Sequence, residues 1–428
     1  MTSRLGWLLS VLTRRIWFRA SLFSLGAVAT ALLAILASPY IPAHLPTKIG
    51  ADAVDNILGI IASSMLAVTT FSLNIMVSAY SAATSNVTPR ATKLVMEDST
   101  SQNVLATFLG SFLFSLVGIV ALSTGAYGDR GRVVLFVVTI AVIVLVVITL
   151  LRWIDHLSKL GRVTETTARV EKVAADAMRA RREQPFMGGM RFDGTARPPA
   201  SARAVHAQSI GYVQHIDVAA LSKIADADDG EIYVMAIPGK LVDPVTPLAF
   251  AHGLCGDDLD DRVRGCFTIG EVRSFDQDPR FGACVLSEIA SRALSPGIND
   301  PGTAIDVIGR AVRVLAIWAE PRDPETIDEP AFPRVHVPPI EPDDLFEDIF
   351  TGIARDGAGV VEIGVRLQNA FATLARLGDG RYAQAARRHS TLAFERAEAV
   401  LVIEDDKRRL REAAAHVTVA SAKSSVHG

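Results

Sequence analysis

Four long apolar runs within the first 155 residues constrain the fold of this chain more than any other feature. Each run has roughly the 17 to 25 residues needed to cross a hydrocarbon core about 30 Å thick. Lipid offers the backbone no hydrogen bonds, so such runs form helices. The runs are about Ala20–Ala37, Ile57–Tyr80, Val104–Thr124 and Val133–Leu151. The sequence therefore predicts a membrane protein with a four-helix transmembrane region over residues 1–152, followed by a large region of ordinary soluble composition.

The first run also has the features of a cleaved signal peptide, which is the alternative to a membrane span. Its apolar part is longer than a typical signal core, and Ile35 and Ala37 make a poor small-x-small cleavage site. We therefore expect a retained helix.

Lysine and arginine residues beside the runs predict the orientation of the spans. The N-terminal tail holds four arginines, the second connection holds Arg90 and Lys93, and the first connection holds only Lys48. The turn between the third and fourth runs does not fit this pattern, because it carries Arg130 and Arg132 on the side predicted to lie outside the cell. The sequence predicts a multi-pass protein of a bacterial inner (plasma) membrane, surrounded by membrane lipid, with the N and C termini in the cytoplasm.

The second run carries polar side chains on one face. At 100° per residue, these positions fall within about one sixth of the helix circumference. The residues predicted to line a pore or to bond between helices are Ser63, Thr70, Asn74, Ser78 and Ser81. One interpretation is that these residues form hydrogen bonds between helices, each worth only about 0.6 kcal/mol. The other interpretation is that they form the wall of a water-filled path where several copies meet. Pro89 and Arg90 mark the cytoplasmic exit of this segment.

The remaining spans differ from the second. No Asp, Glu, Lys, Arg or His falls inside a span core, which argues against a proton-coupled carrier, because carriers usually need such a group despite its cost. The third run carries Gly110, Ser111, Ser115 and Gly118 at spacings that let another helix approach closely. The fourth run is almost uniformly aliphatic. We expect the third helix to be packed among the others and the fourth to be peripheral.

The cytosolic part is predicted to be an α+β region. Apolar positions at three- and four-residue steps predict that the fourth helix continues through residues 153–183, before a Gly- and Pro-rich linker at 184–200. Short apolar runs separated by Gly, Pro and Asp predict a β-rich domain at 201–272, either a small β barrel or a sandwich. The later parts are a helical motif region at 273–320, a Pro/acid-rich strap at 321–344, C-terminal helices at 345–415 and a disordered tail at 416–428.

Two Asp-Pro pairs in the helical motif region have the pattern of helix starts. Asp278-Pro279 and Asp300-Pro301 each place an N-cap residue before a proline, and capping explains them without a ligand. The alternative is a polar cluster that binds an ion or a small anion, or that fixes a subunit interface. Its members are Arg273, Asp276, Asp278, Glu288, Arg292, Asn299 and Asp300. Their spacing matches no EF-hand loop.

Several function classes find no support in the sequence. The chain has no P-loop, dinucleotide-binding, G-x-S-x-G or H-E-x-x-H motif, and its nine histidines are dispersed. We therefore predict no catalytic residue, no cofactor and no metal site; an enzyme would have to assemble its site from distant residues. A formal net charge of -3 without a basic face argues against nucleic-acid binding. The three cysteines form no C-x-x-C pair and fit thiols in a reducing cytosol.

Two passages of the chain resemble a widespread bacterial family of predicted membrane proteins of unknown function. The first is FSLNIMVSAYSAATSNVTPRAT at 71–92, with Gln102 and FLGSFLFSL after it; the second is IGEVRSFDQDPRFGACVLSEIASRALSPGINDPGTA at 269–304. Family members tend to have a Gln-rich stretch before Ser-Pro-Arg, where this chain has Tyr80-Ser81-Ala82-Ala83 and Thr88-Pro89-Arg90. The resemblance implies four spans and a cytosolic domain with the Ala-Leu-Ser-Pro-Gly-Ile-Asn-Asp-Pro motif, and it carries over no catalytic or binding residue.

The leading functional hypothesis is a homo-oligomeric inner-membrane channel or pore-like protein. In this hypothesis the second span lines a path for ions, and the cytosolic region assembles or gates it. The alternative is a membrane-anchored sensor or scaffold whose cytosolic domain binds an ion, a small ligand or a protein partner. An enzyme acting at the membrane surface ranks third.

Overall fold

A computed structural model describes residues 3–13, 15–37, 51–124, 128–192, 198–320, 329–378 and 380–424. The chain divides into two compact units. The helical unit contains Leu8–Ser85 and Thr92–Glu165, and the mixed unit contains Met1–Trp7, Asn86–Ala91 and Thr166–Gly428. Two short pieces of the predicted transmembrane region therefore belong to the mixed unit.

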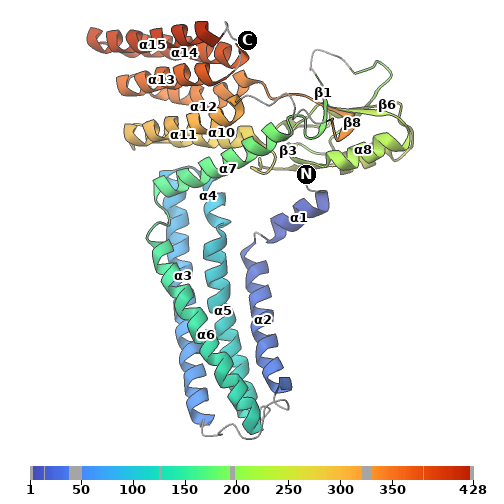
Figure 1. The fold of residues 1–428 in the computed structure, drawn as a ribbon, viewed down its shortest axis with the longest axis vertical. Coiled ribbons are helices and arrows are strands. Elements are labelled where there is room, and N and C mark those ends of the chain that lie inside the picture. The colour runs from blue at the N-terminus through green and yellow to red at the C-terminus, as the bar shows by residue number, and fades with distance from the viewer. Residues whose placement is uncertain are drawn as a thin grey trace. The chain divides into compact units, whose positions relative to one another are not determined.

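Long apolar helices that run side by side build the helical unit (Figure 1). The helices from the start of the chain are α1 (Arg4–Thr13), α2 (Ile16–Ala37), α3 (Ala51–Asn86), α4 (Pro89–Met96), α5 (Ser99–Ser123) and α6 (Gly128–Leu157). By length and composition, three helices can cross a membrane: Ala53–Ser85, Ser99–Ser123 and Gly131–Leu157. The apolar stretch of α2 is shorter, at Trp17–Leu33. Three of the four predicted spans are thus found among the described residues, and the four-span count stays a prediction.

Helix α5 is the most enclosed of these three helices. Its most apolar window is 61% buried, whereas that of α6 is 17% buried. A Cβ atom at Gly110 would lie 3.4 Å from the backbone oxygen of Phe23, and one at Gly118 would lie 3.0 Å from Leu58. These close approaches confirm that the third predicted helix is packed among the others and that the fourth is peripheral.

The predicted continuous helix from the fourth span through residue 183 is wrong. Helix α6 ends at Leu157, and a separate helix, α7 (Val163–Glu183), follows. Between them Gly161 has φ +79°, a left-handed conformation that interrupts an α-helix. The helical periodicity beyond the break is real, but it belongs to α7, whose buried face includes Val170, Ala174 and Met178.

The mixed unit contains two open sheets, so the α+β class is correct and the closed β barrel is wrong. The strands are β1 (Gly189–Arg191), β2 (Arg203–His206), β3 (Gly211–Ile216), β4 (Glu231–Val234), β5 (Leu241–Val242), β6 (Pro247–His252), β7 (Phe267–Gly270) and β8 (Phe332–Val337). The larger sheet has the order β1-β8-β4-β6-β2 and the smaller has the order β5-β3-β7. Strand β8 runs parallel to both of its neighbours.

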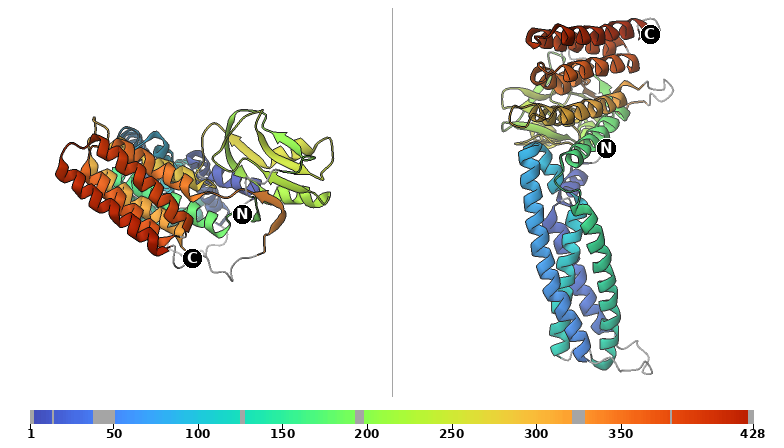
Figure 2. Two further views of the ribbon diagram at one scale, coloured as in Figure 1. Left: turned by 90° about the horizontal axis from the view of Figure 1, so that it is seen from above. Right: turned by 90° about the vertical axis from the view of Figure 1, so that its left-hand side faces the viewer.

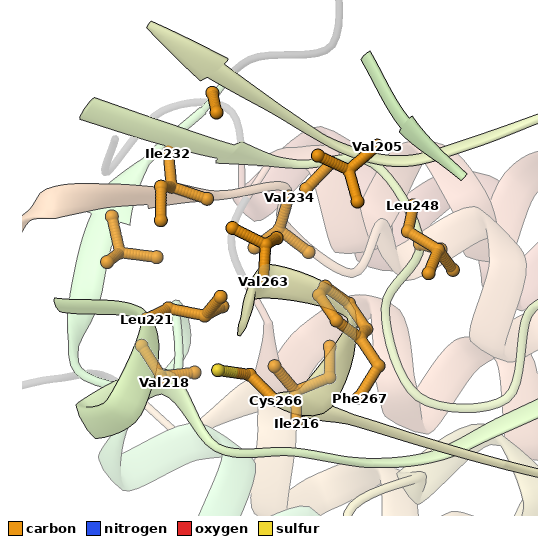
Figure 3. Packing of buried hydrophobic residues seen from close by; sticks show 14 of the residues in the cluster. Val205, Ile216, Val218, Leu221, Ile232, Val234, Leu248, Val263, Cys266 and Phe267 are labelled. Atoms are coloured by element: carbon orange, nitrogen blue, oxygen red, sulfur yellow. The ribbon is translucent and has the colours of Figure 1, made fainter. Parts of the chain in front are cut away.

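Both sheets bury side chains in one shared core together with helices α8 (Val218–Ala227) and α9 (Leu259–Gly265). Ile232 and Val234 of the larger sheet and Phe267 of the smaller sheet point into this core (Figure 3). Strands β1 and β8 come from the predicted linker and the predicted strap, so the β-rich domain extends beyond residues 201–272. Parallel pairing of such distant segments leaves no local pattern in the sequence.

Helices stacked in layers complete the mixed unit (Figure 2). They are α10 (Pro279–Ala293), α11 (Pro301–Ala319), α12 (Pro342–Asp356), α13 (Val361–Leu377), α14 (Gly380–Val400) and α15 (Glu404–Ser424). Helix α15 continues to Ser424, into the part of the chain predicted to be a disordered tail. Parts of the predicted linker, strap and tail, at 193–197, 321–328 and 425–428, lie outside the described residues.

Candidate functional site

The polar face of α3 lies on the outside of a single chain. Every residue predicted to line a pore or to bond between helices is exposed: Ser63, Thr70, Asn74, Ser78 and Ser81. At 100° per residue, this face points away from the buried positions Met65, Ser72 and Met76. The five residues therefore face away from the other helices of the helical unit.

Hydroxyl groups on this polar face bond to their own helix. Ser63 Oγ donates to the carbonyl oxygen of Gly59 at 2.9 Å, and Ser78 Oγ donates to that of Asn74 at 3.0 Å. Within the described ranges, the Asn74 side chain makes no hydrogen bond. A polar bond that joins α3 to α6 lies on its buried face, where Trp153 Nε1 donates to Ser72 Oγ at 2.9 Å. Sequence reasoning missed Ser72 because it lies off the polar stripe.

The exit of α3 is bonded to α10 within the mixed unit. Pro89 begins α4, and the adjacent Arg90 Nη1 lies 2.6 Å from Glu288 Oε1. Thr88 Oγ1 donates to the second carboxylate oxygen of Glu288 at 3.0 Å. The sequence assigned Arg90 and Glu288 to separate groups, and the fold joins them across 198 positions. Both side chains are partly exposed, so the pair adds only about 0–1 kcal/mol to stability.

Arg273 and Asp278 form a bidentate ion pair at the start of α10. Arg273 Nε and Nη2 lie 2.8 and 3.0 Å from the two carboxylate oxygens, and the Asp278 side chain is 1% exposed. Asp278 also accepts from the backbone nitrogen of Phe281 at 3.1 Å, which confirms the predicted N-cap. Burial acts to lower the pKa of Arg273, but the hydrogen bonds and charge of Asp278 raise it overall, so the guanidinium stays charged. A Cβ at Gly239, where φ is +93°, would collide with this carboxylate.

The other members of the predicted cluster make separate contacts. Asp276 accepts from Trp7 Nε1 at 2.9 Å. Asp300 accepts from the backbone nitrogen of Thr303 at 3.0 Å, confirming the second cap, and is exposed. Asn299, with φ 51°, is exposed beside it, and Arg292 is partly buried near the end of α10. The fold thus brings Arg273 to Asp278 but directs Asp276, Glu288 and Asp300 to different partners.

Arg181 is a buried charge that sequence reasoning missed. Its side chain is 4% exposed, and its Nε and Nη2 atoms find no hydrogen-bond partner among the described residues. Burial lowers the pKa of Arg181 to about 10, while the nearby charge of Asp278 acts to raise it. The sequence did contain a signal for this burial, because Arg181 lies three residues after Met178 and therefore on the apolar face of α7. Within the described ranges, no three His, Cys, Asp or Glu side chains gather closely enough to hold a metal ion.

Comparison with known proteins finds relatives but no described activity. A family model described as “Predicted membrane protein (DUF2254)” matches residues 13–373. The chain is similar to uncharacterized proteins of Mycobacterium bovis and Mycobacterium tuberculosis, each 25% identical over 280 residues, which is 63% of this chain and 53% of the relative. The chain therefore spans about half the length of these curated relatives. No solved structure matches it.

Proposed function

The chain belongs to the family described as Predicted membrane protein (DUF2254), and from this premise we propose that it is a homo-oligomeric channel of the bacterial inner membrane. In this proposal α3 of each copy faces a shared polar path, and the N and C termini lie in the cytoplasm. One observation carries it: the polar residues of α3 are exposed on the side of the helix opposite its own packing partners.

Contact of the polar face of α3 with lipid is less favourable than its contact with water or with a second copy of the chain. An amide moved into a hydrocarbon without a hydrogen-bond partner costs roughly 2–7 kcal/mol, depending on the reference state. Asn74 is such an amide, because a single chain provides its side chain no partner among the described residues. The neighbouring hydroxyls already bond to carbonyls of α3. Water or a second copy satisfies the Asn74 amide.

The length of the polar face favours a path over a local contact. From Ser63 to Ser81 the face runs for about 27 Å at 1.5 Å per residue, close to a hydrocarbon thickness of about 30 Å. A local contact between subunits needs only one or two such groups. The outer face of α6 between residues 137 and 151 offers no comparable lining, since its exposed residues there are aliphatic, among them Val137, Ile140, Val144 and Leu151.

The end of α3 gives the mixed unit a means of acting on the path. The residues that follow α3, Thr88 and Arg90, bond to Glu288 of α10. In this proposal, Thr88 and Arg90 are the residues through which the mixed unit acts on α3. We expect Glu288→Ala to change the open probability of the channel without changing its unitary conductance.

The direct test is reconstitution of the purified full-length chain into planar bilayers. Unitary currents are expected, and Asn74→Leu or Thr70→Val should lower the conductance, because each removes a polar group from the path. The matched control is Leu73→Ile, which alters an exposed apolar residue on the flank of α3. Silent bilayers from an oligomer shown to be intact, or equal conductance in Asn74→Leu and Leu73→Ile, would refute the proposal.

Cross-linking tests the arrangement of the subunits separately. In a Cys255→Ser background, Ser78→Cys should form a disulfide with the same residue or a neighbouring residue of another copy, because the proposal brings copies of α3 together. Native mass spectrometry should report an oligomer. A monomer in mild detergent and in nanodiscs would contradict the shared path.

A further inference from the structure

The start of the chain is held in the mixed unit by a buried tryptophan that the proposed function leaves unexplained. Trp7 is 7% exposed, whereas Leu8, which follows it in α1, is 44% exposed. The Trp7 Nε1 atom donates a hydrogen bond to Asp276 Oδ2 at 2.9 Å. Its ring stacks on that of His215, with the ring centroids 5.3 Å apart. We call residues 3–7 the N-terminal anchor.

The first turn of α1 makes a second contact of the anchor. Ser3 Oγ accepts a hydrogen bond from the backbone nitrogen of Gly6 at 3.2 Å, so the anchor begins its own helix. The backbone nitrogen of Arg4 donates to Asp217 Oδ2 at 2.7 Å, and the Arg4 guanidinium donates to the carbonyl oxygen of Gly265. Backbone N–H groups of a first helical turn have no partner within the helix, and a carboxylate beside them is favourable. Asp217 therefore recognises a helix start.

The second of the two family passages builds the site that receives the anchor. Ser274 Oγ donates to Asp276 Oδ2 at 3.0 Å and orients the carboxylate that Trp7 reaches. Gln277 bonds to the backbone of Ile216 at the end of β3, because its Oε1 accepts from the nitrogen at 2.9 Å and its Nε2 donates to the oxygen at 3.4 Å. These bonds involve no residue of the anchor. We call the residues that receive it the anchor site: His215, Asp217, Gly265 and Asp276.

Both carboxylates of the anchor site keep a partner when the anchor leaves. Asp276 remains bonded to Ser274, and Asp217 Oδ1 accepts from the backbone nitrogen of Ala220 at 3.0 Å as the N-cap of α8. Release therefore avoids the large cost of a buried charge without a partner. Among the anchor side chains that the structure describes, Trp7 is the buried one. A preformed site and a single buried side chain favour reversible binding.

We propose that the anchor site is a peptide-binding site that holds and releases the chain's own N-terminal anchor. Its ligand is a peptide with a helix start and a tryptophan at the spacing of Arg4 and Trp7. An indole provides both a ring that stacks and an N–H that donates, whereas phenylalanine provides only the ring. In this proposal the anchor also regulates the channel, because α2 follows it along the chain. The regulation rests on the proposed function, whereas binding and release do not.

Binding is tested with the full-length Trp7→Ala protein in mild detergent and a fluorescent peptide of residues 1–9. Fluorescence anisotropy should show saturable binding, because the site of this variant lacks its indole. Wild-type protein should bind the peptide at least about tenfold more weakly, since its own anchor competes at a high effective concentration. A peptide carrying Trp7→Phe should also bind at least about tenfold more weakly, because it lacks a donor to a carboxylate.

Variants of the site separate specific binding from partition of the peptide into detergent. Adding Asp276→Ala to Trp7→Ala should weaken peptide binding at least about tenfold, and Asp276→Asn, which keeps an acceptor without the charge, should cause a smaller loss. Asp176→Ala is the matched control, because Asp176 is exposed on α7 and pairs with Arg179; it should change nothing. The inference is overturned if the peptide does not bind the Trp7→Ala protein, if it binds wild type equally well, or if Asp276→Ala and Asp176→Ala have equal effects.

Release of the anchor is measured by trypsin cleavage after Arg4, followed by mass spectrometry. Trp7→Ala should raise the cleavage rate at least about tenfold over wild type, and equal rates would overturn release. In planar bilayers Trp7→Ala should change the open probability and leave the unitary conductance unchanged. An unchanged open probability in conducting bilayers overturns the regulation. Silent bilayers refute the channel itself, and the peptide and cleavage results then decide the anchor site by themselves.

Discussion

The two Asp-Pro helix starts allow the buried ion pair to be separated from helix capping. Asp278 and Asp300 have φ of -115° and -116°, and each accepts a hydrogen bond from the backbone three residues later, at 3.1 and 3.0 Å. They differ in environment. Asp278 is buried and paired with Arg273, whereas Asp300 is exposed. Alanine at each position removes the same cap, and only Asp278→Ala also breaks a buried pair.

The expected difference in stability is large. Loss of an N-cap costs about 1 kcal/mol. Removing one member of a buried ion pair costs about 3–5 kcal/mol, because the remaining charge is left without its partner. Asp278→Ala should therefore lower the free energy of unfolding by about 4–6 kcal/mol, and Asp300→Ala by about 1 kcal/mol. Arg181 adds to the first value, because it also lies near the charge of Asp278.

Thermal unfolding of the full chain in detergent measures this difference. The readouts are far-UV circular dichroism and the protease resistance of the mixed unit. One kcal/mol shifts the Tm of a domain of this size class by about 2–4 °C, so Asp278→Ala should lower the Tm by at least about 8 °C and Asp300→Ala by about 2–4 °C. Arg273→Met combined with Asp278→Ala should recover part of the loss. Equal shifts for the two single variants would refute the assignment of a stabilising buried pair.

Three further predictions follow from burial and close packing. With a maleimide at pH 8, mass spectrometry should find only Cys255 labelled, because it is exposed and burial raises the pKa of the other two thiols to about 12. Burial lowers the pKa of His389 below 6.5, because its effect is larger than the opposing effect of the neighbouring carboxylates. The unfolded chain therefore binds a proton more readily than the folded chain, and unfolding scans should show that stability falls as the pH drops below about 6.5. His389→Gln should reduce this loss of stability. Gly282→Val should destabilise α10 against Ala174 of α7 by about 1–3 kcal/mol in denaturant titrations, whereas Gly297→Ala, with open space around it, should be neutral.

Local chemistry explains which predictions were confirmed. Asp278 and Asp300 cap helices because an Asp followed by Pro favours a helix start whatever surrounds it. The small residues of α5 predicted close packing because a missing side chain lets any neighbour approach. The polar stripe of α3 follows directly from the period of the helix.

Contacts between distant segments explain what the sequence missed. Nothing near Glu288 indicates that Thr88 and Arg90 bond to it, and nothing near Phe332–Val337 indicates that β8 lies between β1 and β4. The break between α6 and α7 was hidden because apolar positions continue on both sides of Gly161.

The sequence by itself determined the apolar helices, the two capped helix starts and the presence of a polar face on α3, because each depends on residues within a few turns of one another. Only the tertiary structure decided that this face points away from the other helices of the helical unit, that both sheets are open, and that Asp278 is buried against Arg273 while Asp300 is exposed. The physical reason is that burial depends on which distant segments pack over a residue. Burial in turn sets whether a polar group is only a cap or a paired charge, and whether a stripe of hydroxyls and an amide needs a partner from outside its own chain.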